Sequence, residues 1–386
     1  TLGVSMHLKL TTICLIISAT LSSILIFFLL DKPLLTKEES HKILNLLKYS
    51  EESNNQNSIT SLSEKLGQNF IVGIPTTQID DKTIEILHHI KPAGIVLYSR
   101  NFESFSQLKE LILELQKISK EDTNMPYFIM LDEEPEGALR VGLLKNIFSL
   151  EIPQWKKIER DISILSSLGI NVELAPLADF PFDNNSFVAR RIPVKTVEDL
   201  VSFNRTFIKI LKDYKISATL KHFPGMGIFE DDPHNKFLHS IINKNTLKKS
   251  LDIFKDGIEN CADFVMTCHA MYDNLDSENP ATFSRTIVTD ILKDQLNFKG
   301  IIVTDDISDM PLSIKGLDLT DAGIKALKAG HNLIMFSHNL DKTKEIFDEI
   351  LYKVNTDPEL KAIIENNYLK IIAFKDKNLN IKIKAP

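Results

Sequence analysis

The chain has 386 residues, of which 43% are apolar and 25% are charged, and this composition excludes a disordered or fibrous protein. Its 45 Lys and Arg stand against 52 Asp and Glu, and the resulting net charge of −7 gives no support for nucleic-acid binding as the main role. Cys14, Cys261 and Cys268 are too few for a disulfide framework, and their spacing is not that of a metal site.

Residues 10–30 form an uncharged and mostly apolar run. As a helix this run would measure about 31 Å, close to the thickness of a bilayer core. We therefore predict a membrane anchor or signal segment over residues 1–32, with an uncleaved anchor favoured and a cleaved signal as the alternative. The folded domain would then lie outside the cytoplasm, in the periplasm or the extracellular space, or would be secreted if residues 1–30 are removed. Residues 33–60 are polar and predict a stalk.

From residue 61 to residue 386 the sequence predicts a single α/β domain. Short apolar runs alternate with amphipathic stretches, which is typical of parallel strands separated by helices. The predicted strands are residues 69–74, 93–98, 127–132, 172–177, 218–223, 264–269, 300–305 and 332–337. The predicted helices include residues 103–120, 154–168, 195–214, 284–297, 341–354 and 359–374. Eight such units predict a (β/α)8 barrel, of the TIM type. A doubly wound open sheet is the alternative, but no strand is followed by a glycine-rich phosphate loop.

Six of the predicted strands end on ionisable residues, which are Asp132, Asp179, Lys221 with His222, His269, Asp305 with Asp306, and His338. In a barrel the carboxyl ends of all strands meet at one rim, where active sites are built. We therefore expect a convergent polar site there. For Asp179 and His338 the ordinary polarity of strand ends is a sufficient explanation, and for His269 a buried structural role is expected.

Several motifs occur in order along the chain, namely LSEKLGQ (62–68), KHFPGMG (221–227), DPH (232–234), VMTCH (265–269), PATFS (280–284) and VTDDIS (303–308). Together they resemble the family 3 glycoside hydrolases, specifically the single-domain β-N-acetylglucosaminidases. The resemblance runs from about residue 61 to residue 379.

The resemblance implies a role for each matching position. Asp305 would be the catalytic nucleophile, and His234, paired with Asp232, would be the catalytic acid and base. The substrate would be held by Asp132, Arg140, Arg191, Lys221 and His222. The resemblance implies no metal and no cofactor.

These residue types suit glycoside cleavage. One group must protonate the leaving oxygen while another meets the positive charge that develops at the anomeric carbon. Asp305 could do the second task by forming a covalent glycosyl intermediate, and nearby Lys221 would favour its ionised form. A histidine ordinarily titrates at about pH 6.5, so His234 could give and accept protons near neutrality, with Asp232 orienting its ring.

The sequence departs from the family pattern in two loops. Met226 stands where the family has a second histidine, and Ile228 and Phe229 replace two polar residues. In the other loop, residues 135–137 (Pro-Glu-Gly) replace Gly-Gly-Arg. We expect the first loop to be more apolar, and the pocket beside Asp132 to be more acidic, than in the family.

The leading hypothesis is a monomeric retaining glycosidase that removes terminal β-linked N-acetylglucosamine, or a related amino sugar, from cell-wall fragments or glycoconjugates. The main alternative is an anchored glycan-binding barrel with weak or no activity. A glycoside phosphorylase is a further alternative, as is a metal-dependent hydrolase using His222, His234, His269 and Asp305. A β-glucosidase is less favoured, because the larger β-glucosidases of the family carry a second domain, whereas only residues 358–386 follow the eighth unit.

Overall fold

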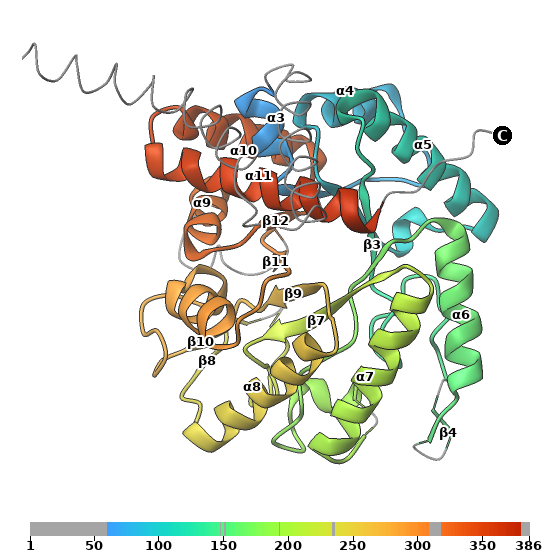
Figure 1. Ribbon diagram of the computed structural model, residues 1–386, viewed down its shortest axis with the longest axis vertical. Coiled ribbons are helices and arrows are strands. Elements are labelled where there is room, and N and C mark those ends of the chain that lie inside the picture. Colours follow the sequence, from blue (N-terminus) through green and yellow to red (C-terminus); the bar gives the residue numbers. More distant parts are fainter. Residues whose placement is uncertain are drawn as a thin grey trace, which may run out of the picture. The chain divides into compact units, whose positions relative to one another are not determined.

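A computed structural model describes residues 60–146, 148–149, 152–192, 194–233, 236–308 and 318–379. Within this part of the chain eight parallel strands close into a barrel (Figure 1). The strands are β1 (Phe70–Gly73), β2 (Gly94–Leu97), β3 (Phe128–Leu131), β6 (Val172–Glu173), β7 (Ser217–Phe223), β9 (Phe264–Thr267), β11 (Ile301–Asp306) and β12 (Leu333–Phe336). The (β/α)8 barrel predicted from the sequence is thereby confirmed, and each predicted apolar run overlaps one of these strands.

The strands follow one another around the barrel in chain order, and β1 closes the ring by pairing with β12. In that pairing Phe70 lies opposite Ile334 and Val72 lies opposite Phe336. Because each strand pairs on both sides, the barrel leaves no exposed sheet edge. Two short additional pairs lie outside the barrel, β4 (Phe148–Ser149) with β5 (Ile152–Pro153) and β8 (His239–Ser240) with β10 (Met271–Tyr272).

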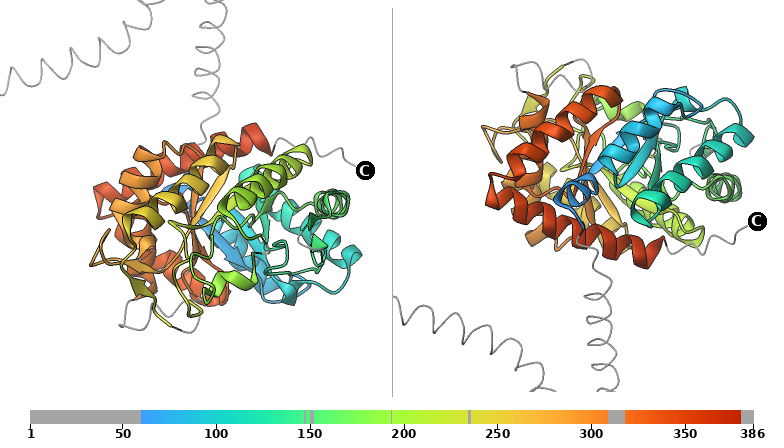
Figure 2. Two further views of the ribbon diagram at one scale, coloured as in Figure 1. Left: turned by 90° about the horizontal axis from the view of Figure 1, so that it is seen from below. Right: turned by 90° about the horizontal axis from the view of Figure 1, so that it is seen from above.

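Helices surround the strands (Figure 2). They are α3 (Leu62–Gly67), α4 (Asp81–Ile90), α5 (Phe105–Thr123), α6 (Trp155–Leu168), α7 (Val197–Asp213), α8 (Lys244–Glu259), a π-helix (Thr286–Gln295), α9 (Leu319–Ala329), α10 (Leu340–Val354) and α11 (Pro358–Asn378). Most begin after a residue whose side chain accepts a hydrogen bond from a backbone N–H of the first turn, which fixes where the helix starts. These capping residues are Ser61, Asp80, Ser104, Thr196, Asn243, Asp318, Asn339 and Asp357.

Alternation along the strands divides the core into two layers. On β3, for example, Phe128 and Met130 face the barrel interior, while Ile129 and Leu131 pack against the surrounding helices. The interior is filled by apolar side chains that the other strands supply in the same way. The barrel is therefore a packed core, and only the strand ends are free to build a site.

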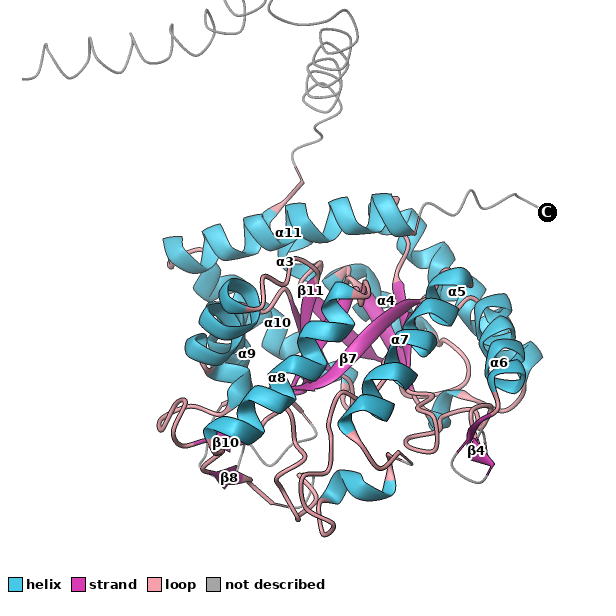
Figure 3. Cartoon of the chain, turned by 60° about the horizontal axis from the view of Figure 1, so that its bottom comes forward, coloured by secondary structure: helices cyan, strands magenta, loops and turns pink. Residues whose placement is uncertain are grey.

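Helix α11 covers the end of the barrel opposite the loops that follow the strands (Figure 3). Phe374 packs edge-on against Phe264, with ring centroids 5.3 Å apart. Lys375 is buried beside it, and its Nζ donates to the Gln68 side-chain oxygen at 2.8 Å and to the Ala93 carbonyl at 2.7 Å. Burial lowers the pKa of this amine to about 7.

Within the described residues no helix is long and apolar enough to span a membrane. The apolar run at residues 10–30 and the stalk lie outside those residues, so both stay predictions. The amphipathic stretch at 284–297 is a helix as predicted, but with the wider π-type turn over Thr286–Gln295.

Candidate active site

A cleft of about 450 Å³ lies over the carboxyl ends of the strands. Side chains from the predicted rim site line it, together with apolar residues such as Leu174, Met266 and Met335 that form the top of the barrel interior. Every predicted site residue that the structure describes lies in this lining, namely Asp132, Arg140, Arg191, Lys221, His222, Asp232 and Asp305. His234 lies outside the described residues.

Two buried carboxylates and a lysine form the centre of the cleft wall. Lys221, at the end of β7, donates to Asp132 Oδ1 at 2.6 Å and lies 2.7 Å from Glu134 Oε1. Arg140 Nη2 donates to the other oxygen of Asp132 at 2.8 Å. Arg191 donates two hydrogen bonds to Glu134, from Nε to Oε2 at 3.1 Å and from Nη2 to Oε1 at 2.5 Å. The five side chains therefore form one continuous ionic network, in which Glu134 is a member that sequence analysis did not single out.

The network contains three cationic and two anionic side chains, and this excess of positive charge lowers the pKa values of the two carboxylates. Burial by itself would raise the pKa of Asp132, but Lys221 and Arg140 outweigh it, and the net pKa lies below its usual range. The pKa of Glu134 is lowered in the same way by Lys221 and Arg191. The surplus positive charge leaves N–H donors that can bind sugar hydroxyls, and it disfavours a metal cation at this wall.

Asp305 faces this network from the end of β11. Its Oδ1 accepts a hydrogen bond from the Asp306 backbone N–H at 2.9 Å, and its Oδ2 lies 3.9 Å from His222 Nε2. About a quarter of the Asp305 side chain is exposed, so it is open to a ligand in the cleft. The carboxylate is thus held in place and accessible, which is what a nucleophile requires.

His222 is oriented from below by Asp179. Its Nδ1 lies 2.7 Å from Asp179 Oδ2, while the other Asp179 oxygen accepts the Met226 backbone N–H at 2.7 Å. Because Asp179 is fully buried and acts only as an acceptor when ionised, it favours the tautomer with the proton on Nδ1. Strand-end polarity alone would not have revealed this partnership.

The loop after β7 is anchored by the residues that depart from the family pattern. Met226 and Phe229 are buried, and the Phe229 ring lies 5.5 Å from that of Tyr272. The Phe229 carbonyl accepts the Phe187 N–H at 2.8 Å, which ties this loop to the loop after β6. A Cβ at Gly227 would lie 1.6 Å from the Phe180 carbonyl oxygen, so only glycine fits. The apolar substitutions therefore pack the base of the loop, and of the three only Met226 is among the cleft-lining residues.

The loop after β3 is organised by Glu133, which is buried. Its carboxylate accepts the backbone N–H groups of Arg140 at 2.8 Å, Val141 at 2.9 Å and Leu144 at 3.1 Å. Glu136, the acid that departs from the family pattern, is not among the cleft-lining residues. The acid that does face the cleft here, Glu134, is neutralised by its cationic neighbours.

Two further strand-end histidines lie close to Asp306. His269 is buried between Thr282 Oγ1 at 2.6 Å and the Asp306 carbonyl at 3.2 Å, and burial lowers its pKa. Its contacts are those of a structural residue. His338 lines the cleft, with Nε2 3.7 Å from Asp306 Oδ2.

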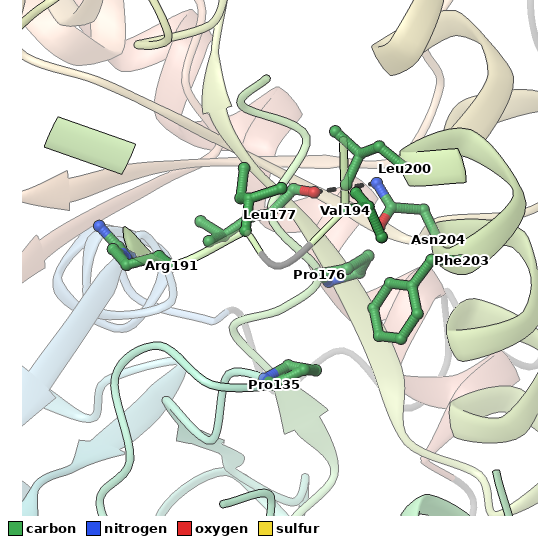
Figure 4. A pocket seen from close by; sticks show the side chains of 9 residues that line it. Pro135, Pro176, Leu177, Arg191, Val194, Leu200, Phe203 and Asn204 are labelled. Atoms are coloured by element: carbon green, nitrogen blue, oxygen red, sulfur yellow. Dashed lines mark hydrogen bonds between the residues drawn. The ribbon is translucent and has the colours of Figure 1, made fainter. Parts of the chain in front are cut away.

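A smaller hollow, which Arg191 also lines, lies between the loops after β3 and β6 and the start of α7 (Figure 4). Pro135, Pro176 and Phe203 are among its mostly apolar lining residues. The side-chain amide of Asn204 donates to the Leu177 carbonyl at 2.9 Å. Because its lining holds no acid or base other than Arg191, reaction chemistry belongs to the larger cleft.

A family model described as the glycosyl hydrolase family 3 N-terminal domain matches residues 61–372. The chain belongs to glycosyl hydrolase family 3. The resemblance seen in the sequence is thereby confirmed, and the chain is a glycosidase that acts on O-glycosyl bonds.

Individual relatives agree with this assignment. The chain is 27% identical to a beta-hexosaminidase of Psychromonas ingrahamii over 301 residues, which cover 73% of this chain and 86% of the relative. A crystal structure of a beta-N-acetylhexosaminidase from Beutenbergia cavernae matches with a TM-score of 0.74 and 25% identity, over 83% of this chain and 100% of the other. A family 3 beta-N-acetylglucosaminidase from a Paenibacillus species shares the fold with a TM-score of 0.73 and 24% identity, over 84% of this chain and 65% of the other.

Proposed function

We propose that the chain is a retaining β-N-acetylglucosaminidase that removes terminal β-linked N-acetylglucosamine, or a related amino sugar, from glycoconjugates or cell-wall fragments. The observation that carries the proposal is the placement of Asp305. This accessible carboxylate faces a cleft wall of five charged side chains, with a surplus of hydrogen-bond donors for sugar hydroxyls. The names of the relatives support N-acetylhexosamine as the sugar.

In the proposed reaction Asp305 attacks the anomeric carbon while His234 protonates the departing glycosidic oxygen. The bond to the aglycone breaks, and an ester forms between the sugar and Asp305. His234 then takes a proton from water, which cleaves the ester and releases the sugar with its original configuration. Asp232, which lines the cleft two residues before His234, would orient the imidazole and stabilise its charged form.

Arg140, Arg191, Lys221 and His222 would hold the sugar, together with the carboxylate of Asp132. Lys221 and Arg140 each already share a hydrogen bond with Asp132, so their positions are fixed before the substrate arrives. A preorganised site loses little free energy in reorganisation when charge develops on the sugar.

The test is hydrolysis of a chromogenic β-N-acetylglucosaminide by the wild-type chain and by Asp305→Asn. We expect kcat to fall by at least about 10³-fold, because the amide cannot act as a nucleophile. Asp252→Asn is the matched control, since this acid is exposed on α8 and should leave kcat unchanged. Full activity of Asp305→Asn would reject the proposal.

The same assay separates the alternatives. Glycan binding without turnover by the wild-type chain would favour a binding protein, and release of sugar 1-phosphate in phosphate buffer would favour a phosphorylase. A fluorinated substrate analogue that slows the second step should leave a sugar-sized mass increase on the peptide containing Asp305.

A further inference from the structure

Tyr98 lies at the end of β2 and lines the cleft, yet no sequence motif pointed to it. Its ring contacts two guanidinium groups, with the Arg100 Cζ 4.4 Å and the Arg140 Cζ 4.9 Å from the ring centroid. Its hydroxyl lies 2.7 Å from Ser337 Oγ. The side chain therefore contacts both the sugar-binding wall and the residue that directly follows β12.

The ring acts on Arg140. Asp132 Oδ2 accepts hydrogen bonds from Arg140 Nε at 3.3 Å and from Nη2 at 2.8 Å, which fixes the edge of the guanidinium. The Tyr98 ring supplies a face for the same group, and such a cation–π contact is stronger in a partly desolvated site. Arg100 supports the ring and is itself fixed by the Ile74 carbonyl at 3.0 Å and the Ser337 carbonyl at 2.7 Å.

The hydroxyl acts on the nucleophile through Asp306. Ser337 donates to Asp306 Oδ2 through its hydroxyl and, at 3.1 Å, through its backbone N–H. Ser308 donates to the other oxygen through its backbone N–H at 2.7 Å and its hydroxyl at 2.5 Å. When Asp306 is ionised, the Ser337 hydroxyl proton is donated to it, and the Tyr98 hydroxyl then donates to Ser337 Oγ. Asp306 in turn places the backbone N–H that binds Asp305 Oδ1.

We propose that Tyr98 is a positioning residue both for sugar binding and for the attack by the nucleophile. Its ring holds Arg140 against the sugar, and its hydroxyl holds Asp306, and through it Asp305, against the anomeric carbon. The inference rests on the proposed function and adds to it a residue that sets the affinity for the sugar and the rate of attack separately.

The experiment measures kcat and KM for a chromogenic β-N-acetylglucosaminide with two variants of Tyr98. Tyr98→Phe keeps the ring and removes only the hydroxyl, so kcat should fall about fivefold while KM stays within about twofold. Tyr98→Leu also removes the aromatic face, so KM should rise about tenfold in addition to the same loss in kcat. A merely structural role would not divide the two constants in this way.

Ser337→Ala tests the connection between Tyr98 and Asp306. It should reproduce the loss in kcat of Tyr98→Phe, and the double variant should show no further loss, because both changes break one chain of hydrogen bonds. Tyr352→Phe is the matched control, since this tyrosine is exposed on α10 and should change neither constant. Thermal unfolding of each variant confirms that it is folded.

If Asp305→Asn loses activity as expected, three results would overturn the inference about Tyr98 while leaving the proposed function intact. These are an unchanged kcat in Tyr98→Phe, additive losses in the double variant, and equal KM values for the Phe and Leu variants. If Tyr98→Leu does not fold, the Phe and Ser337→Ala variants still decide the matter. A wild-type chain without turnover, or a fully active Asp305→Asn, would overturn the proposed function and this inference with it.

Discussion

At the scale of single residues, the site depends on buried acids that are not among the cleft-lining residues. Asp179 is the clearest case, because one of its carboxylate oxygens contacts the His222 ring and the other accepts the Met226 backbone N–H. One side chain therefore sets both the orientation of a cleft-lining histidine and the start of the loop that leads to His234. A fully buried carboxylate is costly unless such partners satisfy it, and this explains why both oxygens are used.

Asp179→Asn tests this double role. The asparagine oxygen can still accept the Met226 N–H, but its NH₂ group would face His222 Nδ1 and favour the other tautomer. We expect kcat to fall about 100-fold with little loss of thermal stability. Asp183→Asn, an exposed acid in the same loop, is the control. Equal activity of the two variants would show that the histidine tautomer does not matter.

At the scale of elements, α11 closes the end of the barrel opposite the cleft. Its apolar residues complete the interior core, but Lys375 brings an amine into it, and among the described residues its partners are two oxygens and the Phe128 ring. In the unfolded chain this amine is protonated below about pH 10.5, its ordinary pKa. In the folded chain it is protonated only below about pH 7. Between these values protons favour the unfolded state, so the free energy of unfolding decreases as the pH falls from 10.5 to 7.

Lys375→Met removes this dependence. We expect the free energy of unfolding of the wild type, measured relative to that of the variant, to rise by roughly 3 kcal/mol between pH 7 and pH 10. Chemical denaturation of both proteins at several pH values gives this difference directly. Lys377→Met, at an exposed position of the same helix, should show no comparable trend. A pH-independent difference for Lys375→Met would contradict the shifted pKa.

The elements themselves were largely predictable, because each strand is a short apolar run and several end on a charged residue. Lys221 and Asp305 could be placed at the rim from local patterns alone. The partners could not, since Lys221 meets Asp132 across 89 residues and Arg191 meets Glu134 across 57. The role of Tyr98 could not be predicted either, because an aromatic residue after an apolar run indicates only the end of a strand. Which side chains meet is decided by barrel closure, and no local periodicity encodes it.

At the scale of the whole molecule, all eight strands of the barrel lie between residues 70 and 336, and the family match begins at residue 61. We therefore expect the chain shortened to residues 60–386 to fold and to hydrolyse a soluble chromogenic substrate. Its kcat/KM should lie within about twofold of that of the full chain, and its midpoint of thermal unfolding within a few degrees. A large loss in either quantity would show that residues 1–59 contribute to the catalytic domain.

The packed barrel interior and helix α11 have a consequence for the order of events. Substrate and products must use the same opening of the cleft, because the barrel interior beneath it is filled with side chains and its far end is covered by α11. In the proposed reaction the sugar stays bound to Asp305 while the aglycone leaves through this opening, and only then can a water molecule enter. A small alcohol that enters before water would compete for the sugar, so the proposed intermediate predicts transfer of the sugar to acceptors other than water.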